Sequence, residues 1–138
     1  MRNGKRILTI LFVVSIAFSA HPVFDHALPK LSEYGFFSEP IKDQIPKDKV
    51  IPYVIASPLF SDYAEKLRFI KVPKNGKIAH DDDLVLDFPV GTFLIKTFYY
   101  QSDVRDSNSE RRLIETRLLK KIPGEWVAIP YIWNDDQT

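Results

Sequence analysis

The sequence has no cysteine among its 138 residues, and this absence removes several kinds of chemistry. Without cysteine the chain forms no disulfide, offers no thiolate nucleophile, and lacks the usual ligands of iron–sulfur clusters and covalently attached haem. Its only long apolar run, residues 7–18, is too short to span a bilayer in the usual way. Neither sign of charge is in large excess, because the sequence has 19 basic and 18 acidic residues. That balance argues against an electrostatic nucleic-acid binder.

Patterns typical of catalytic or metal sites are missing as well. His21, His26 and His80 are not spaced as a set of converging metal ligands. The acidic run 81–83 lacks the alternating aspartates and the glycine of a calcium loop. No Gly-x-Ser-x-Gly turn with a histidine partner accompanies the serines. We therefore predict no catalytic residue, no metal ligand and no cofactor site; whether the chain is an enzyme stays open, and a non-catalytic role is favoured.

Residues 1–19 have the pattern of a signal peptide. Three basic residues precede the apolar run, and the small residues Ala17 and Ser19 occupy the positions that a signal peptidase reads. The pattern predicts cleavage after Ser19, with Ala20 as the other position and an uncleaved short anchor as the alternative. We expect a periplasmic or secreted protein, with no stable membrane span once the signal peptide is removed.

The remaining residues, 20–138, are predicted to form a single β-rich domain, because a chain of this length has no room for a second core. Loss of three basic residues with the signal peptide would change the formal charge from +1 to −2. Residues 28–37 contain no pattern for a supporting element, so we expect Leu31, Tyr34 and Phe36 to attach an extended segment to the core.

Five glycines and ten prolines favour short segments joined by rigid connections. Residues 50–56 are a first strand candidate, and Pro52 indicates an edge strand or a strand start. Residues 67–72 alternate like a strand, and 84–88 form a short one. Between these two segments, Asn75-Gly76 predicts a hairpin turn, because both residues tolerate positive φ angles.

The densest β pattern lies in residues 92–100 and 111–120, which flank the polar loop 101–110. Pairing them as a hairpin collects the apolar side chains on one face. The predicted pairs are Phe93 with Leu118, Ile95 with Thr116, and Thr97 with Ile114. On the other face this register places Lys96 opposite Glu115, which we interpret as a structural ion pair.

Pro123-Gly124 predicts a second tight turn, because proline fixes φ and glycine accepts a positive one. Pairing across this turn brings further residues to the same buried face. The predicted pairs are Ile129 with Leu118, Tyr131 with Thr116, and Trp133 with Ile114. Trp126 falls on the opposite face and is the best candidate for an exposed aromatic. The predicted fold is all-β, an antiparallel sandwich or jelly-roll-like domain with a C-terminal three-stranded meander.

Three groups of segments carry a family resemblance. They are PLFSDYAEK (58–66) with RFI (68–70), FPVGT (88–92) with IKTF (95–98), and ETRLL (115–119) with YIWNDDQT (131–138). Together they resemble an uncharacterised family of exported bacterial proteins, labelled conserved hypothetical or di-haem c-type cytochrome and sometimes joined to a sugar-dehydrogenase-like propeller. The resemblance covers Leu31 to the C-terminus.

The sequence departs from this family at one important point. Family members continue past the Trp-Asn-x-x-Gln-Thr segment to a Cys-x-x-Cys-His haem site, whereas this sequence ends at Thr138 without any cysteine. We therefore expect the N-terminal β-domain alone, either truncated relative to the family or a stand-alone copy. Haem-based electron transfer is not carried over.

The resemblance implies a non-catalytic exported accessory or interaction domain. Its expected partner is a periplasmic c-type cytochrome or a dehydrogenase, and nucleic acid is not expected as a partner. Two alternatives stay open: a small carbohydrate- or ligand-binding module that uses exposed aromatics such as Trp126, or a gene fragment with no independent function.

Overall fold

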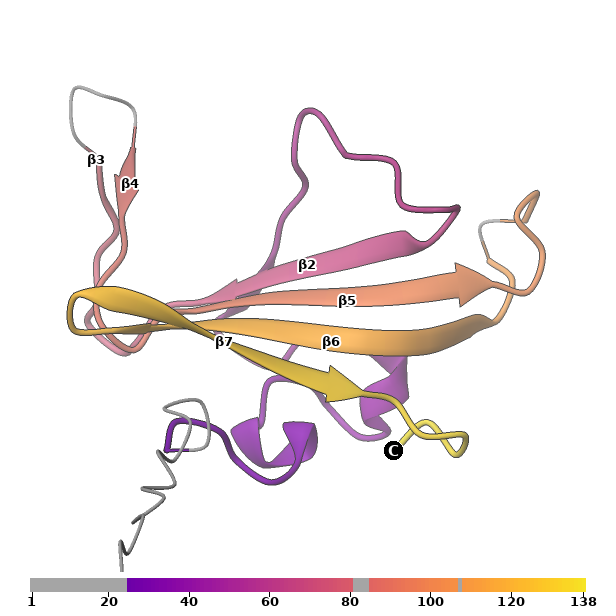
Figure 1. The fold of residues 1–138 in the computed structure, drawn as a ribbon, viewed down its shortest axis with the longest axis horizontal. Coiled ribbons are helices and arrows are strands. Elements are labelled where there is room, and N and C mark those ends of the chain that lie inside the picture. The colour runs from indigo at the N-terminus through magenta and orange to yellow at the C-terminus, as the bar shows by residue number, and fades with distance from the viewer. Residues whose placement is uncertain (1–24, 81–84, 107) are drawn as a thin grey trace, which may run out of the picture.

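The computed structural model describes residues 25–80, 85–106 and 108–138. The predicted signal peptide and the acidic run 81–83 lie outside these residues. Within them the chain forms a five-stranded antiparallel sheet in the order β1-β2-β5-β6-β7, so that each strand lies beside a neighbour in chain order (Figure 1). The strands are β1 (Val50–Pro52), β2 (Glu65–Lys71), β5 (Phe93–Gln101), β6 (Arg111–Ile122) and β7 (Glu125–Ile132).

A separate two-stranded sheet interrupts the path from β2 to β5. It consists of β3 (Ala79–His80) and β4 (Leu86–Asp87), which project from one end of the main sheet in Figure 1. A turn is present at Asn75-Gly76, where Asn75 has φ 68° and the Gly76 N–H bonds to the Pro73 carbonyl. The expectation that this turn joins two paired strands is wrong, because β2 pairs with β1 and β5 instead.

One face of the main sheet is covered by the segment before β1. This segment contains two short 3-10 helices, η1 (Leu31–Tyr34) and η2 (Ile41–Asp43), drawn in purple in Figure 1. The expected attachment of this segment is confirmed: Leu31 and Phe36 are buried, and the Tyr34 ring stacks on that of Phe36 at 5.1 Å. The buried core consists of Leu31, Phe36, Phe37, Ile41, Val50, Phe69, Ile95, Leu118, Val127 and Ile129.

The predicted all-β antiparallel class and the C-terminal meander are therefore confirmed. The layer that covers the core is mostly irregular chain with two helical turns, and the second sheet, β3 with β4, has only two strands. An irregular segment can cover this face in place of a second large sheet, because its Phe36 and Phe37 side chains are both buried. Two aromatic side chains bury a large apolar area with few residues.

The meander register is confirmed for one hairpin and wrong for the other. Across Pro123-Gly124, Leu118 lies opposite Ile129 and Thr116 opposite Tyr131, as predicted, and Gly124 has φ 83°. Between β5 and β6 the observed register differs by two residues, so the same face stays buried. The observed pairs are Phe93 with Lys120, Ile95 with Leu118, and Thr97 with Thr116.

A β-bulge accounts for one of these two residues, and the pairing next to the 101–110 loop accounts for the other. The pairing shifts between Phe98 and Tyr99, so that Tyr99 lies opposite Leu113 and Ile114 becomes the extra residue of β6. Leu113, at 1% exposure, takes the core position that alternation assigned to Ile114. The Gln137 side chain occupies the gap beyond β7, because its amide accepts a hydrogen bond from the Leu113 N–H (2.7 Å) and donates one to the Leu113 carbonyl (3.1 Å).

The covered face also holds a buried polar chain at its centre. The Thr97 hydroxyl donates to Gln44 Oε1 (2.6 Å), and it lies 2.8 Å from the Thr116 hydroxyl, which in turn accepts from Trp133 Nε1 (2.9 Å). Gln44 Nε2 donates to the Ile41 carbonyl. No buried side-chain nitrogen or oxygen is left without a partner in the described part of the chain. This chain of hydrogen bonds ties η2 to β5, β6 and the residue after β7.

Candidate functional site

The other face of the sheet, here called the outer face, presents the alternate residues of each strand. Successive side chains point to opposite faces, so those next to the buried Phe69, Thr97 and Thr116 point away from the core. On β2 and β5 these residues include Lys66, Arg68, Lys96 and Phe98, and on β6 they include Glu115 and Arg117.

Three of these residues form a cationic row, defined as Arg68, Lys96 and Arg117. Arg68 is the register partner of Lys96 across β2 and β5, and Lys96 is the partner of Arg117 across β5 and β6. Like charges that stand directly opposite each other on a sheet are destabilising. Three adjacent strands nevertheless present a cation in the same row. Adjacent cations on one exposed face form a candidate surface for an anionic group.

The prediction that Lys96 and Glu115 form a cross-strand ion pair is wrong. Glu115 lies opposite Phe98, because the register differs by two residues. Its carboxylate instead binds the guanidinium of Arg117, with Nε and one terminal nitrogen each 2.8 Å from a carboxylate oxygen. This fork-shaped pairing is the geometry that arginine favours with a carboxylate. Glu115 therefore neutralises Arg117, while Lys96 stays between two cations.

An aromatic ring lies among these charges. The Lys96 Nζ is 4.6 Å from the centroid of the Phe98 ring, and the Arg117 Cζ is 4.9 Å from it. Both distances are within the range of a cation–π contact, which holds a cation in place without neutralising it. Phe98 thus helps to position the two cations and leaves their charge available.

The electrostatic environment of Lys96 reflects this crowding. Burial lowers the pKa of Lys96, and the charges of Arg68, Arg117 and Lys66 lower it further, whereas Glu115 acts in the opposite direction. The positive form of Lys96 is therefore less favoured here than in water. A bound anion would reverse this effect, since an opposite charge within about 4–6 Å favours the charged form.

A groove lies beside the cationic row. Its volume is about 410 Å³, and one wall is the chain between β1 and β2, from Ile55 to Ser61. The Lys66 Nζ donates to the Leu59 carbonyl at 2.9 Å and so ties this wall to the sheet. The full lining is Ile55, Leu59, Phe60, Ser61, Lys66, Arg68, Lys96, Phe98 and Arg117. Four of these residues are cations and none is an acid.

Trp126, predicted as the exposed aromatic, lies elsewhere. It is half-buried near the Pro123-Gly124 turn, where its ring packs edge-on against Phe88 with centroids 5.6 Å apart. The Lys121 Nζ lies 5.4 Å from the centre of the same ring. Trp126 therefore already has neighbours on its ring, and it does not line the groove beside the cationic row.

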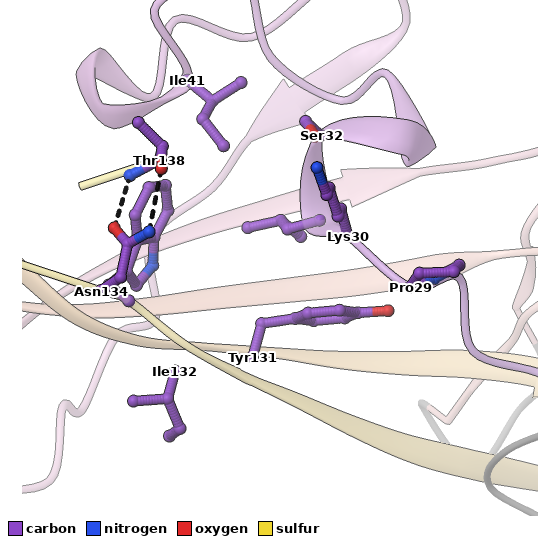
Figure 2. A pocket seen from close by; sticks show the side chains of 10 residues that line it. Pro29, Lys30, Ser32, Ile41, Tyr131, Ile132, Asn134 and Thr138 are labelled. Carbon is purple, nitrogen blue, oxygen red and sulfur yellow. Dashed lines mark hydrogen bonds between the residues drawn. The ribbon is translucent and has the colours of Figure 1, made fainter. Parts of the chain in front are cut away.

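A second hollow, of about 370 Å³, lies between the covering segment and β7 (Figure 2). Figure 2 shows Tyr131 extending beneath Lys30 toward Pro29, while Asn134 and Thr138 bond to each other. The Tyr131 hydroxyl donates to the Leu28 carbonyl at 2.6 Å and lies 3.0 Å from the Tyr34 hydroxyl. Burial and the bond to Tyr34 raise the pKa of Tyr131. These groups fasten the covering segment to β7, so we assign this hollow a structural role.

In residues 25–80, 85–106 and 108–138, no group of three or more histidine, aspartate or glutamate side chains is arranged to hold a metal ion. In the same described ranges, no helix is long and apolar enough to cross a membrane. Comparisons with protein-family models, with curated proteins and with solved structures give no match. The interpretation of the site therefore depends on its geometry.

Sequence reasoning identified only part of this site. The predicted register assigned Lys96 an acidic partner, so it indicated a structural role for this residue. Arg68 was missed because a long connection separates β2 from β5, and alternation within one strand does not show which residues stand opposite in another. A signal was present, since Lys66, Arg68 and Lys96 all occupy positions that alternate with apolar residues.

Proposed function

We propose that this chain is an exported, non-catalytic binding domain, and that its outer sheet face binds an acidic surface of a protein partner. The observation that carries the proposal is the cationic row, in which Lys96 stands between Arg68 and Arg117 in register. Glu115 neutralises only Arg117, so the groove keeps an excess of positive charge. A carboxylate-bearing surface would supply the complementary negative charge.

The resemblance suggests the class of partner, namely a periplasmic c-type cytochrome or a dehydrogenase. Complementary charge mainly accelerates association and selects among partners, and exposed charge pairs contribute little each. We therefore expect a transient complex whose formation depends on ionic strength. This behaviour suits an accessory domain that orients a redox protein, because such a protein must also be released.

The experiment is a calorimetric titration of the purified protein with an acidic c-type cytochrome, and with a basic one as the comparison. We expect binding to the acidic cytochrome alone, weakened strongly by salt because a Debye length of about 3 Å at 1 M screens exposed charges. The variant with Arg68→Glu and Lys96→Glu should lose this binding.

The matched control variant carries Lys74→Glu and Lys77→Glu. Both lysines are exposed in the connection between β2 and β3, so the double variant has the same change in net charge away from the cationic row. It should bind the acidic cytochrome almost as well as the wild type. Equal losses in the two double variants would show that only net charge matters, and the proposed surface would be wrong.

A further inference from the structure

The connection between β1 and β2, residues 53–63, exposes large apolar side chains close together, and we call it the apolar loop. The exposed fractions are 92% for Val54, 83% for Leu59, 73% for Phe60 and 77% for Tyr63. Single exposed apolar residues are ordinary on protein surfaces. Several on one short loop, by contrast, indicate a surface that contacts something apolar.

The apolar loop projects from the molecule in an ordered conformation. Figure 1 shows it rising beyond β2, away from the two 3-10 helices. The rings of Phe60 and Tyr63 meet edge to face with centroids 5.3 Å apart, and the bond from Lys66 Nζ to the Leu59 carbonyl holds the base of the loop. The Ala64 N–H closes a turn onto the Ser61 carbonyl at 2.8 Å. These contacts favour outward presentation of the aromatic rings.

Cations surround the base of the same loop. Leu59 and Phe60 line the groove together with Lys66, Arg68 and Lys96. Apolar and aromatic side chains beside a cluster of cations are the combination by which peripheral proteins bind anionic bilayers. The apolar groups enter the headgroup boundary, and each lysine or arginine near the surface is attracted to anionic lipid.

We infer that the apolar loop is a membrane-contact element, in which Leu59 and Phe60 insert into the headgroup region of an anionic bilayer while Lys66 and Arg68 face the lipid phosphates. This inference goes beyond the proposed function, because it depends on apolar side chains that an acidic protein surface has no need for. The two share Arg68 in the cationic groove, so lipid and the protein partner would compete for that residue.

The shape of the apolar loop favours a bilayer over a protein as its partner. A stable protein interface takes roughly 20–30 residues a side with a well-packed centre. Of the large apolar side chains in the described residues, four of the six most exposed lie on this one projecting loop, and the sheet beside it is cationic. A bilayer requires no shape complementarity, only exposed apolar side chains beside positive charge.

The test uses the protein recovered after export, with its N-terminus determined by mass spectrometry, in a vesicle sedimentation assay. If residues 7–18 are retained, they contribute equally to every variant, so the comparison between variants stands. Wild-type protein should bind vesicles with about 30% phosphatidylglycerol roughly tenfold or more tightly than pure phosphatidylcholine vesicles, given the expected gain per cation. Equal binding to both would overturn the role of the cations.

The decisive variant carries Leu59→Ser and Phe60→Ser. It should bind the anionic vesicles roughly tenfold or more weakly, because two apolar side chains no longer leave water. The control is Val104→Ser, since Val104 is 74% exposed in the loop between β5 and β6, and its binding should be unchanged. Sedimentation of the double variant equal to that of the wild type would overturn the inference.

A second readout does not depend on a loss of binding. A Tyr63→Trp variant adds a third tryptophan to the two native ones. On binding to vesicles with brominated acyl chains, the fluorescence of this variant should be quenched more than that of the wild type. If quenching is absent, the loop does not insert. If the serine variant loses binding to the acidic cytochrome while no variant binds vesicles, the loop serves the protein partner and the lipid inference is wrong.

Discussion

Thr97 and Thr116, on the inner face of the sheet, are fully buried and joined to Gln44 and Trp133 by hydrogen bonds. On the outer face of the same strands, Lys96 stands between two cations, and among the described residues only one of these two cations has an acidic partner. The same three central strands therefore carry one face where every buried polar side chain is satisfied and another where like charges oppose each other.

The difference shows where this fold tolerates unfavourable electrostatics. An unsatisfied polar group in the core costs about 1–3 kcal/mol, because it loses its hydrogen bonds to water without replacement. Like charges on an exposed sheet face cost less, roughly 0.2–1 kcal/mol for a directly opposed pair. A binding surface can therefore retain its repulsion at small cost to stability, whereas the inner face cannot. This is why we assign folding to one face and binding to the other.

The largest expected effect contrasts neighbouring leucines on β6. Leu118 is fully buried and Leu119 is 39% exposed. Leu118→Ala should lower the free energy of unfolding by about 2–5 kcal/mol, because it leaves a cavity in the core. Leu119→Ala should cost about 1 kcal/mol or less, since little apolar area is removed. Urea unfolding measures both, and equal losses would mean that another layer covers the outer face.

The next effect concerns the buried polar chain. Thr97→Val should lower the free energy of unfolding by about 1–3 kcal/mol, because Gln44 Oε1 loses its hydrogen-bond donor and the Thr116 hydroxyl loses a partner. Thr97→Ser keeps the hydroxyl and should cost clearly less. Denaturant unfolding of the two variants decides the point. A valine variant as stable as the serine variant would show that the hydroxyl is not needed.

A smaller effect, of opposite sign, is expected on the outer face. Lys96→Gln removes the central charge of the cationic row and should raise the free energy of unfolding by about 0.2–1 kcal/mol. The same variant should bind the acidic cytochrome less tightly. As a control, Lys74→Gln should change neither quantity, since Lys74 is exposed away from the row. Loss of stability in Lys96→Gln would contradict the repulsion that we attribute to this face.

The smallest effect is a dependence on alkaline pH. The pKa of Lys96 is lowered in the folded protein from its ordinary 10.5, so between the folded and unfolded values the unfolded chain binds more protons. The contribution of Lys96 to stability therefore rises as pH increases toward 10.5. Unfolding midpoints of the wild type and Lys96→Gln, compared from neutral to alkaline pH, should converge. A constant difference would contradict the lowered pKa.

The sequence predicts the inner face better than the outer one. Alternation in β5, β6 and β7 identified Phe93, Ile95 and Leu118 as inward-facing, and a register error of two residues did not change this, because faces repeat every second residue. The same error changed the partner of Lys96 from a cation to an acid. Charge pairing depends on the exact opposite residue, so it is far more sensitive to register than burial is.

The remaining differences have causes that alternation within a strand does not contain. The bulge at Ile114 depends on Gln137, which reaches back to the Leu113 backbone across 24 positions of chain. The cationic row depends on pairing between β2 and β5, which the β3–β4 excursion separates in sequence. In both cases the deciding contact joins segments that are distant in the chain.

The most direct test of the cationic row as a binding surface is a nuclear magnetic resonance titration of the isotope-labelled protein with an acidic c-type cytochrome. We predict that backbone amide shifts concentrate at Arg68, Lys96 and Arg117 and their outer-face neighbours, and that they disappear at high salt. Amides around Gln44, beneath the inner face, should not move. Shifts confined to the covering segment, or an absence of shifts at low salt, would contradict the assignment of binding to the outer face.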